Sequence, residues 1–282
     1  MPKMVKGVIA GDDFLTEVLI RGLTLNGPAD AYYIGNCSNK FAARLISKCG
    51  VHVLRNMSDF IQSSAVIFFT CKEDEIKTLF PQVAAKIKPW TLIVSALRNV
   101  ELETLESYFP NNEIIRLIVN PSVISGSGLG AYVVSTNSSP DASSIAQMVL
   151  KDCGEVIAVK NEQELMEINN YLQANTYLAY TVVQLMSNNA KLMGMEPKEA
   201  AFSVNHLLKG AVRTLLELGG DTTDLALKAL TDEKLHKHAV DLIKQYGFVD
   251  DLNKALTEPE VKERPEFNDD PGDYKMHYRW SR

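Results

Sequence analysis

The sequence predicts an α/β protein in which a doubly wound parallel sheet is followed by an all-α domain. Between residues 5 and 159, short apolar runs of strand length alternate with segments of helical periodicity. This alternation is typical of a parallel sheet whose strands are joined by helices. From residue 161 onward the apolar runs stop and only helical periodicity remains. The first part therefore indicates a Rossmann-type sheet, and the second part a helical domain.

The expected elements of the first part follow one another closely along the chain. Buried strands are expected at residues 5–10, 31–35, 51–54, 65–70, 91–96 and 113–119. Helices are expected at 14–25, 40–49 and 73–87. In the first helix the residues near one face are Phe14, Val18, Leu19, Gly22 and Leu25. A strand at 131–136 is expected near the sheet edge, followed by a helix around 141–154 and a strand at 155–159.

The second part is expected to begin with a long helix over residues 161–193, because no proline or strong break occurs before Gly194. Its unusually apolar face indicates burial against other helices or another subunit. Pro197 opens a further helix that ends at residues 219–220, and residues 221–247 predict two shorter helices. We therefore expect a Rossmann-like domain at 1–158, a helical dimerisation domain at 159–256, and an extended or disordered tail at 257–282, which is rich in proline and charge.

The composition predicts a soluble cytoplasmic protein. The net charge of -6 gives no indication of nucleic-acid or membrane binding, both of which favour basic patches. No apolar run is long enough for a membrane span, and the N-terminus has no signal-peptide cleavage pattern. No metal site is expected, because the four cysteines lack C-x-x-C spacing and because His236 and His238 diverge on a helix.

Several segments share their order and spacing with one known family. EVLIRGL at 17–23 is similar to that family's first helix, and VIFFTCK at 66–72 to a strand ending in a valine-lysine-proline turn. Residues 114–132 resemble its arginine–valine–methionine–proline–asparagine segment, and 194–200 its glycine-leucine-proline helix break. The matching positions in 114–132 are Arg116, Asn120, Gly126, Gly128 and Ala131. Over residues 5–256 the chain resembles the pyrroline-5-carboxylate reductases, the last enzymes of proline synthesis.

The resemblance implies a Rossmann domain, a helical dimerisation domain, and NADPH or NADH as hydride donor. The substrate that it implies is a cyclic imine carboxylate, reduced at its C=N bond. The family's active site lies between the nucleotide domain and helices of a partner chain. For this chain the resemblance therefore implies a homodimer through residues 161–256, with higher assembly left open, and a small-molecule ligand.

The glycine loop departs from the family's pattern. Its G-x-G and following small residue correspond to Gly11, Asp13 and Thr16. Asp13 replaces the glycine that lets backbone approach a pyrophosphate, and one charge repulsion at about 4–5 Å costs about 3–4 kcal/mol at an effective dielectric near 20. Two interpretations stay open: Asp12 or Asp13 caps the following helix, or a cofactor binds despite them. The candidate cofactor-binding residues of this loop are Gly11, Asp12, Asp13, Phe14 and Leu15.

Three later strand ends supply the other cofactor candidates. The second strand ends in Asn36, Ser38, Asn39 and Lys40, which suit a 2′-phosphate better than a ribose hydroxyl, so that NADPH is the expected cofactor if any binds. A plain polar loop is the alternative. The remaining candidates are Thr70, Cys71 and Lys72, where Glu73 replaces the family's proline, and Asn120 as a hydrogen-bond donor. The glycines at 125–130 fit either the family's segment or a plain β turn.

The family's substrate motifs are the most altered. Its serine- and glycine-rich stretch corresponds to YLQANTYL at 171–178, which has no glycine and whose polar residues are Gln173, Asn175 and Thr176. Its threonine motif is reduced to GGDTT at 219–223. The resemblance carries the candidate catalytic roles to Thr222, Thr223 and Lys72, with a helix cap as the alternative for the threonines.

Three functions stay open at this point. The first is a reductase that transfers hydride from NADPH to an imine. The second is a catalytically inactive dimer that acts as a scaffold or binds a ligand without a dinucleotide, which the simultaneous loss of three motifs favours. The third is a cleft for a ligand without pyrophosphate, for example a cationic one. Fold alone does not choose among them.

Overall fold

The computed structural model describes residues 5–25, 28–54, 56–139, 141–219 and the single residue 237. The two helices predicted at 221–247 and the tail predicted at 257–282 lie outside these residues. The chain divides into two compact units, residues 1–207 and 208–282. The domain boundaries predicted at 158/159 and 256/257 stay predictions.

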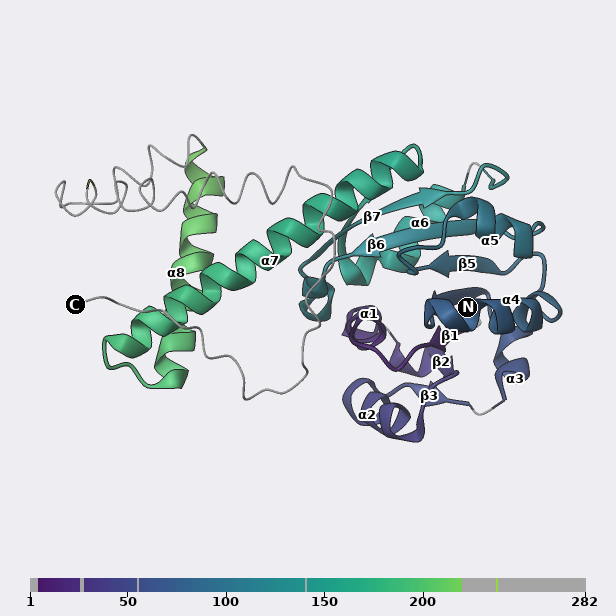
Figure 1. Cartoon of the computed structure of the whole chain (residues 1–282), viewed down its shortest axis with the longest axis horizontal. Helices are drawn as coiled ribbons and strands as arrows, with labels where there is room; N and C mark the ends of the chain where they lie inside the picture. Colours follow the sequence, from purple (N-terminus) through teal and green to yellow (C-terminus); the bar gives the residue numbers. More distant parts are fainter. Residues whose placement is uncertain (1–4, 26–27, 55, 140, 220–236, 238–282) are drawn as a thin grey trace. The chain divides into compact units, whose positions relative to one another are not determined.

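The first unit contains an eight-stranded sheet with the order β3-β2-β1-β4-β5-β6-β7-β8 (Figure 1). The strand order reverses between β1 and β4, which makes a crevice at their carboxyl ends. The strands are β1 (Lys6–Ala10), β2 (Tyr32–Gly35), β3 (His52–Val53), β4 (Val66–Thr70), β5 (Leu92–Ser95), β6 (Ile114–Val119), β7 (Gly128–Val134) and β8 (Gly154–Ala158). These strands confirm the predicted alternation.

The sheet differs from the fully parallel prediction at one pair. β7 runs antiparallel to β6, with Leu117 opposite Tyr132, and β8 then pairs parallel to β7 at the edge. The reversal follows from the short connection between β6 and β7, residues 120–127, which contains one 3-10 helix, η3 (Pro121–Ser125). A parallel pairing would need a crossover of a dozen or more residues.

Helices cover both faces of the sheet. One apolar cluster packs α1 (Phe14–Leu25), α2 (Asn39–Cys49) and α6 (Ala142–Leu150) against one face. A second cluster packs α3 (Met57–Ile61), α4 (Ile76–Ala84), α5 (Leu102–Tyr108) and the start of α7 (Glu162–Leu192) against the other face. Neighbouring residues of β1 enter opposite clusters, Val8 in the first and Ile9 in the second, as alternation along a strand requires.

The helix predictions are wrong in a few places. Phe14 and Leu25 lie outside the buried face of α1, with 67% and 48% of their surface exposed, while Ile20 and Leu23 are buried instead. The predicted 73–87 helix begins as the 3-10 helix η2 (Glu73–Glu75). The short helices α3 and α5 were not predicted, because five and seven residues are too few for a clear helical period.

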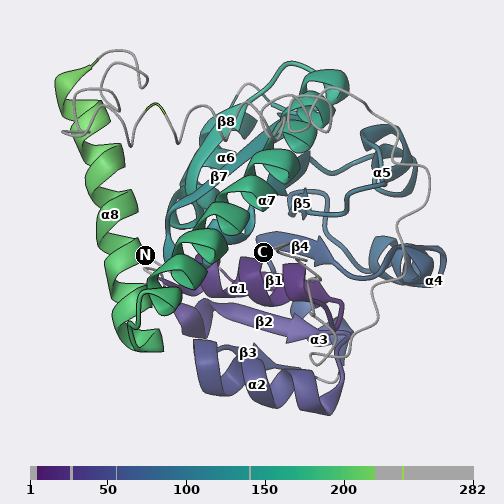
Figure 2. The same cartoon turned by 60° about the vertical axis from the view of Figure 1, so that its left-hand side comes forward.

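The long helix α7 (Glu162–Leu192) has 31 residues. Its beginning packs on β6 and β7 through Leu165 and Leu172 (Figure 2). Most of its later apolar side chains are exposed in this single chain, among them Tyr177 and Leu192. The following helix α8 (Pro197–Leu218) begins at Pro197, as predicted.

Candidate functional site

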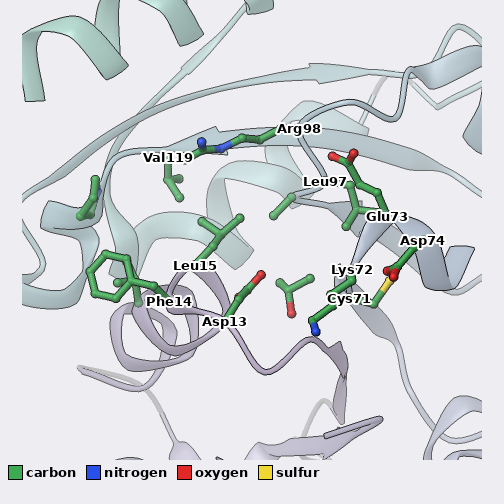
Figure 3. Close-up of a pocket in the computed structure, with 14 residues that line it drawn as sticks. Asp13, Phe14, Leu15, Cys71, Lys72, Glu73, Asp74, Leu97, Arg98 and Val119 are labelled. Atoms are coloured by element: carbon green, nitrogen blue, oxygen red, sulfur yellow. The ribbon is translucent and has the colours of Figure 1, made fainter. Parts of the chain in front are cut away.

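A cavity of about 550 Å³ lies at the carboxyl ends of β1, β4, β5 and β6 (Figure 3). Ligands of open α/β sheets bind outside this edge, where the strand order reverses. Its lining residues come from the start of α1 and the turns after three strands: Asp13, Phe14, Leu15, Val18, Thr70, Cys71, Lys72, Glu73, Asp74, Ala96, Leu97, Arg98, Val119 and Pro121. The predicted residues Asp13, Phe14, Leu15, Thr70, Cys71 and Lys72 are therefore brought together.

Asp13 caps helix α1 and also lines this cavity. Its Oδ1 accepts a hydrogen bond of 2.7 Å from the Thr16 backbone amide, which confirms the capping interpretation for this residue. The bond satisfies one of the free amides at the helix start. The cap does not remove the carboxylate from the cavity, so its negative charge lies at the rim where a phosphate would meet α1.

The turn before α1 is held against β4. The Gly11 amide donates to the Thr70 carbonyl at 3.1 Å, and the Thr16 hydroxyl donates to the same oxygen at 3.0 Å. A Cβ atom on Gly11 would lie 3.0 Å from that oxygen. Gly11 therefore keeps the close approach of two strands, as the glycine-loop prediction requires.

Asp12 has a different partner from the one that helix capping predicts. Both of its carboxylate oxygens accept from the Ser38 backbone amide, at 2.9 and 3.2 Å. The side chain therefore joins the turn after β1 to the loop after β2. The prediction that either aspartate could cap α1 is resolved in favour of Asp13, because Asp12 reaches across to the neighbouring strand end.

Asn36 and Glu75 lie beside the contact between Asp12 and Ser38 and form further hydrogen bonds there. Asn36 adopts a left-handed backbone conformation with φ of 61°. Its Nδ2 donates to the Ala10 carbonyl at 3.0 Å and to Glu75 Oε2 at 3.2 Å. The same Glu75 oxygen accepts from the Lys72 amide at 3.1 Å. Sequence reasoning missed Glu75, although three consecutive acids after a buried strand were a signal for it.

A cavity of about 320 Å³ lies beside these groups and is lined by Asp12, Asn36, Cys37, Ser38, Lys72 and Glu75. Lys72 lines both this cavity and the larger one, so it is placed between them. Burial raises the pKa of the neighbouring Cys71 thiol to about 12, and the Glu75 carboxylate adds to the effect. Cys71 is therefore a neutral lining group rather than a nucleophile.

The other predicted residues lie apart from the main cavity. Asn39 borders a separate cavity of about 590 Å³ beside α2. Lys40 is exposed at the start of α2 and does not line the cavities of about 550, 590 and 320 Å³. The predicted catalytic residues Thr222 and Thr223 lie outside the described residues.

Asn120 has a structural role that its prediction as a ligand donor did not include. Its Oδ1 accepts from the Leu129 amide at 3.0 Å. It borders a cavity of about 190 Å³ near Tyr171, Asn175 and Thr176 of α7. The segment 171–178 is an uninterrupted part of this helix, so its backbone amides are engaged in helical bonds and offer no nest for a carboxylate.

The glycines at 125–130 serve packing rather than a plain β turn. Gly126 follows η3 as its C-cap with φ of 69°, and Gly128 is the first residue of β7. A Cβ atom on Gly128 would lie 2.2 Å from the Val123 side chain and 2.5 Å from the Cys153 carbonyl. These distances are shorter than those for a Cβ atom on Gly130, and they leave no room for a side chain at position 128.

Arg116 is a buried charge that joins the sheet to α7. Only 1% of its surface is exposed, although it lies in the middle of β6. Its guanidinium pairs with Glu162 at the start of α7 and donates to the Arg98 carbonyl. Glu162 also accepts from the Leu102 amide at 2.9 Å. The pair fixes α7 and the loop that carries Arg98 to the cavity.

The described residues were compared with the requirements of a membrane-spanning helix and of a metal site. No helix among the described residues is long and apolar enough to cross a membrane. In the same part of the chain, no group of three or more His, Cys, Asp or Glu side chains could hold a metal ion. The cytoplasmic location stays a prediction from composition.

Curated proteins that are similar in sequence to this chain are pyrroline-5-carboxylate reductases. The chain is 21% identical over 248 residues to pyrroline-5-carboxylate reductase 2 of Macaca fascicularis, which covers 85% of this chain and 77% of that protein. It is 22% identical over 250 residues to pyrroline-5-carboxylate reductase 3 of Mus musculus, covering 88% and 90%. No model of a known protein family matches the chain.

Solved structures share the fold. The pyrroline carboxylate reductase of Plasmodium falciparum, solved with NADP bound, superposes with a TM-score of 0.75 at 15% identity and covers 91% of this chain and 95% of that one. The enzyme of Coxiella burnetii gives 0.73 at 18% identity, covering 90% and 95%. The chain is therefore similar in sequence to pyrroline-5-carboxylate reductases at 21–22% identity, and it shares the fold of their solved structures.

Proposed function

We propose that this chain is an oxidoreductase that reduces the C=N bond of a small cyclic imine with a nicotinamide dinucleotide, as the names of its relatives suggest. The observation that supports it is the open cavity of about 550 Å³ at the reversal of strand order, with the start of α1 at its rim. A cleft in this position is where dinucleotides bind in this class of sheet.

The residues at the site fit such a cofactor in shape, while one charge opposes it. Gly11 allows the tight turn, and Lys72 between the two cavities provides a cation for phosphates. Asp13 places a like charge beside the same position, so the affinity is expected to be weak. When bound, the cofactor supplies the hydride, and the chain orients the reactants and excludes water.

A second function is favoured by a separate observation. Asp12 and Asp13 already accept backbone amides, and the substrate segment in α7 is a continuous helix. These hydrogen bonds and the continuous helix support a chain that keeps the fold and has lost catalysis. Such a chain would act as a scaffold or bind a ligand that is not a dinucleotide. The two functions differ in whether NADH or NADPH binds at all.

The same proposal includes a homodimer through residues 161–256. Apolar side chains remain exposed along α7 in the single chain: Tyr171, Tyr177, Tyr180, Val183, Leu185 and Leu192. Exposed apolar surface of this extent marks an interaction site. Light scattering on the purified protein tests it, and a monomer at micromolar concentration contradicts it.

Calorimetric titration with NADH and NADPH tests the cofactor. A dissociation constant below about 1 mM for either one supports the oxidoreductase, and no binding at that concentration favours the second function. Reduction of pyrroline-5-carboxylate is then followed by the loss of nicotinamide absorbance. Lys72→Met should lower kcat/KM, while Lys77→Met, a matched change at an exposed lysine of α4, should not.

A further inference from the structure

The 320 Å³ cavity at the end of β2 carries two carboxylates in fixed positions. Asp12 is held by the Ser38 amide through both oxygens, at 2.9 and 3.2 Å. Glu75 is held by the Asn36 side-chain amide at 3.2 Å and by the Lys72 backbone amide at 3.1 Å. Neutral amides donate all of these hydrogen bonds, so none of them brings a positive charge to either carboxylate.

One cation faces the two acids in this cavity. Lys72 is the only Lys or Arg among its lining residues. Ser38, one of the residues predicted to suit a 2′-phosphate, donates its backbone amide to Asp12. A dianionic phosphate in this cavity would therefore meet more negative than positive charge and find the amide occupied.

Sites that prefer NAD use a carboxylate near the end of the second strand to accept from the ribose 2′-hydroxyl, and sites for NADP use a cation there. In this chain the second strand ends in Asn36 rather than an acid. We infer that Asp12, reaching over from the turn after β1, takes the role of that acid and makes the cavity select a free 2′-hydroxyl over a 2′-phosphate.

This inference rests on the proposed function and reverses the NADPH preference that residues 36–40 predicted. Asp12 is a specificity-determining residue of the adenosine half of the site. It acts on the ribose and takes no part in hydride transfer. Glu75 supports it with a second negative charge on the same cavity.

Calorimetry with two probes that lack nicotinamide tests the inference directly: ADP-ribose and its 2′-phosphate. The full-length protein should bind ADP-ribose roughly tenfold more tightly than the 2′-phosphate. Asp12→Asn keeps an oxygen for the Ser38 amide and removes the charge, so it should reduce that ratio to about threefold or less. Asp141→Asn, at an exposed aspartate before α6, should leave the ratio unchanged.

Other outcomes overturn the inference. A parent protein that binds the 2′-phosphate as well as ADP-ribose, a ratio unaffected by Asp12→Asn, or binding of neither probe would each refute it. Thermal unfolding of Asp12→Asn is measured in parallel, and the neighbouring Ser38→Ala serves as a second variant, since it keeps the backbone amide and should keep the selectivity. Loss of selectivity in Ser38→Ala contradicts the role of the backbone contact.

Failure of the proposed function can be distinguished from failure of the role of Asp12. Selective ADP-ribose binding without any reduction of an imine leaves the inference standing and removes the oxidoreductase. Imine reduction with tighter binding of NADPH than of NADH leaves the oxidoreductase standing and removes the role of Asp12.

Discussion

The cap of α1 allows the charge of Asp13 to be separated from its structural contribution. Asparagine caps a helix about as well as aspartate, whereas alanine does not cap. Asp13→Asn therefore keeps the 2.7 Å contact with the Thr16 amide and removes the charge from the cavity rim. Asp13→Ala removes both the cap and the charge.

The expected magnitudes follow from the position of the carboxylate. Two like charges about 4–5 Å apart repel by about 3–4 kcal/mol at an effective dielectric near 20. Asp13 is partly exposed, so solvent and salt reduce the repulsion to about 1–2 kcal/mol. Removal of the charge should then tighten dinucleotide binding roughly tenfold. Loss of the cap should cost about 1 kcal/mol of unfolding free energy.

Calorimetry with NADH and chemical denaturation measure the two effects on the same samples. Both variants should bind more tightly than the parent protein, and only Asp13→Ala should unfold at lower denaturant. The reasoning is refuted if Asp13→Asn leaves the affinity for NADH unchanged, or if the two variants are equally destabilised. A salt series provides a further check, because the gain from removing the charge should shrink as ionic strength rises.

Four further predictions concern other parts of the first unit. Arg116→Met should cost about 3 kcal/mol or more in denaturant unfolding, because it leaves Glu162 without its buried partner, and a change below about 1 kcal/mol would contradict this. Gly128→Ala should lower the melting temperature, since its Cβ has no room; an unchanged temperature speaks against the packing role. The hydrogen bond from Lys48 lowers the pKa of Glu17 below 4.5, so this carboxylate stabilises the fold above about pH 4.5 and loses that effect as the pH falls through its folded pKa. Glu17→Gln should therefore destabilise the protein at neutral pH and do so less and less as the pH is lowered below about 4.5, and an effect that stays constant with pH would refute the assignment. Cys71, with a pKa of about 12, should resist alkylation at pH 8 in the folded protein, and rapid labelling there would disagree with its burial.

Local patterns were enough to predict most of the first unit. The helix at 14–25 was predicted with the bounds of α1 because apolar periodicity and an aspartate cap coincide there. The strands followed from short apolar runs such as VIFFT at 66–70. The direction of β7 was not available from its composition, because an internal strand of either direction is apolar.

The candidate site was predicted only in part, and for a physical reason. Residues next to one buried strand end, such as Asp13 and Lys72, were placed in the cavity because the carboxyl ends of parallel strands share one edge. Asn120 was assigned to a ligand, but its side-chain oxygen accepts from Leu129 nine positions further along the chain. That pairing depends on how β6 and β7 meet.

The sequence by itself determined the class of fold and the charge placed at the start of α1. Both of these depend on neighbouring residues and on the alternation of apolar and polar positions. Only the tertiary structure decided which aspartate caps the helix and which crosses to Ser38, because adjacent side chains on one turn leave in different directions. It also brought Glu75 to Asn36, 39 positions away in the chain, where a hydrogen bond depends on the packing of β2 and β4 on either side of β1.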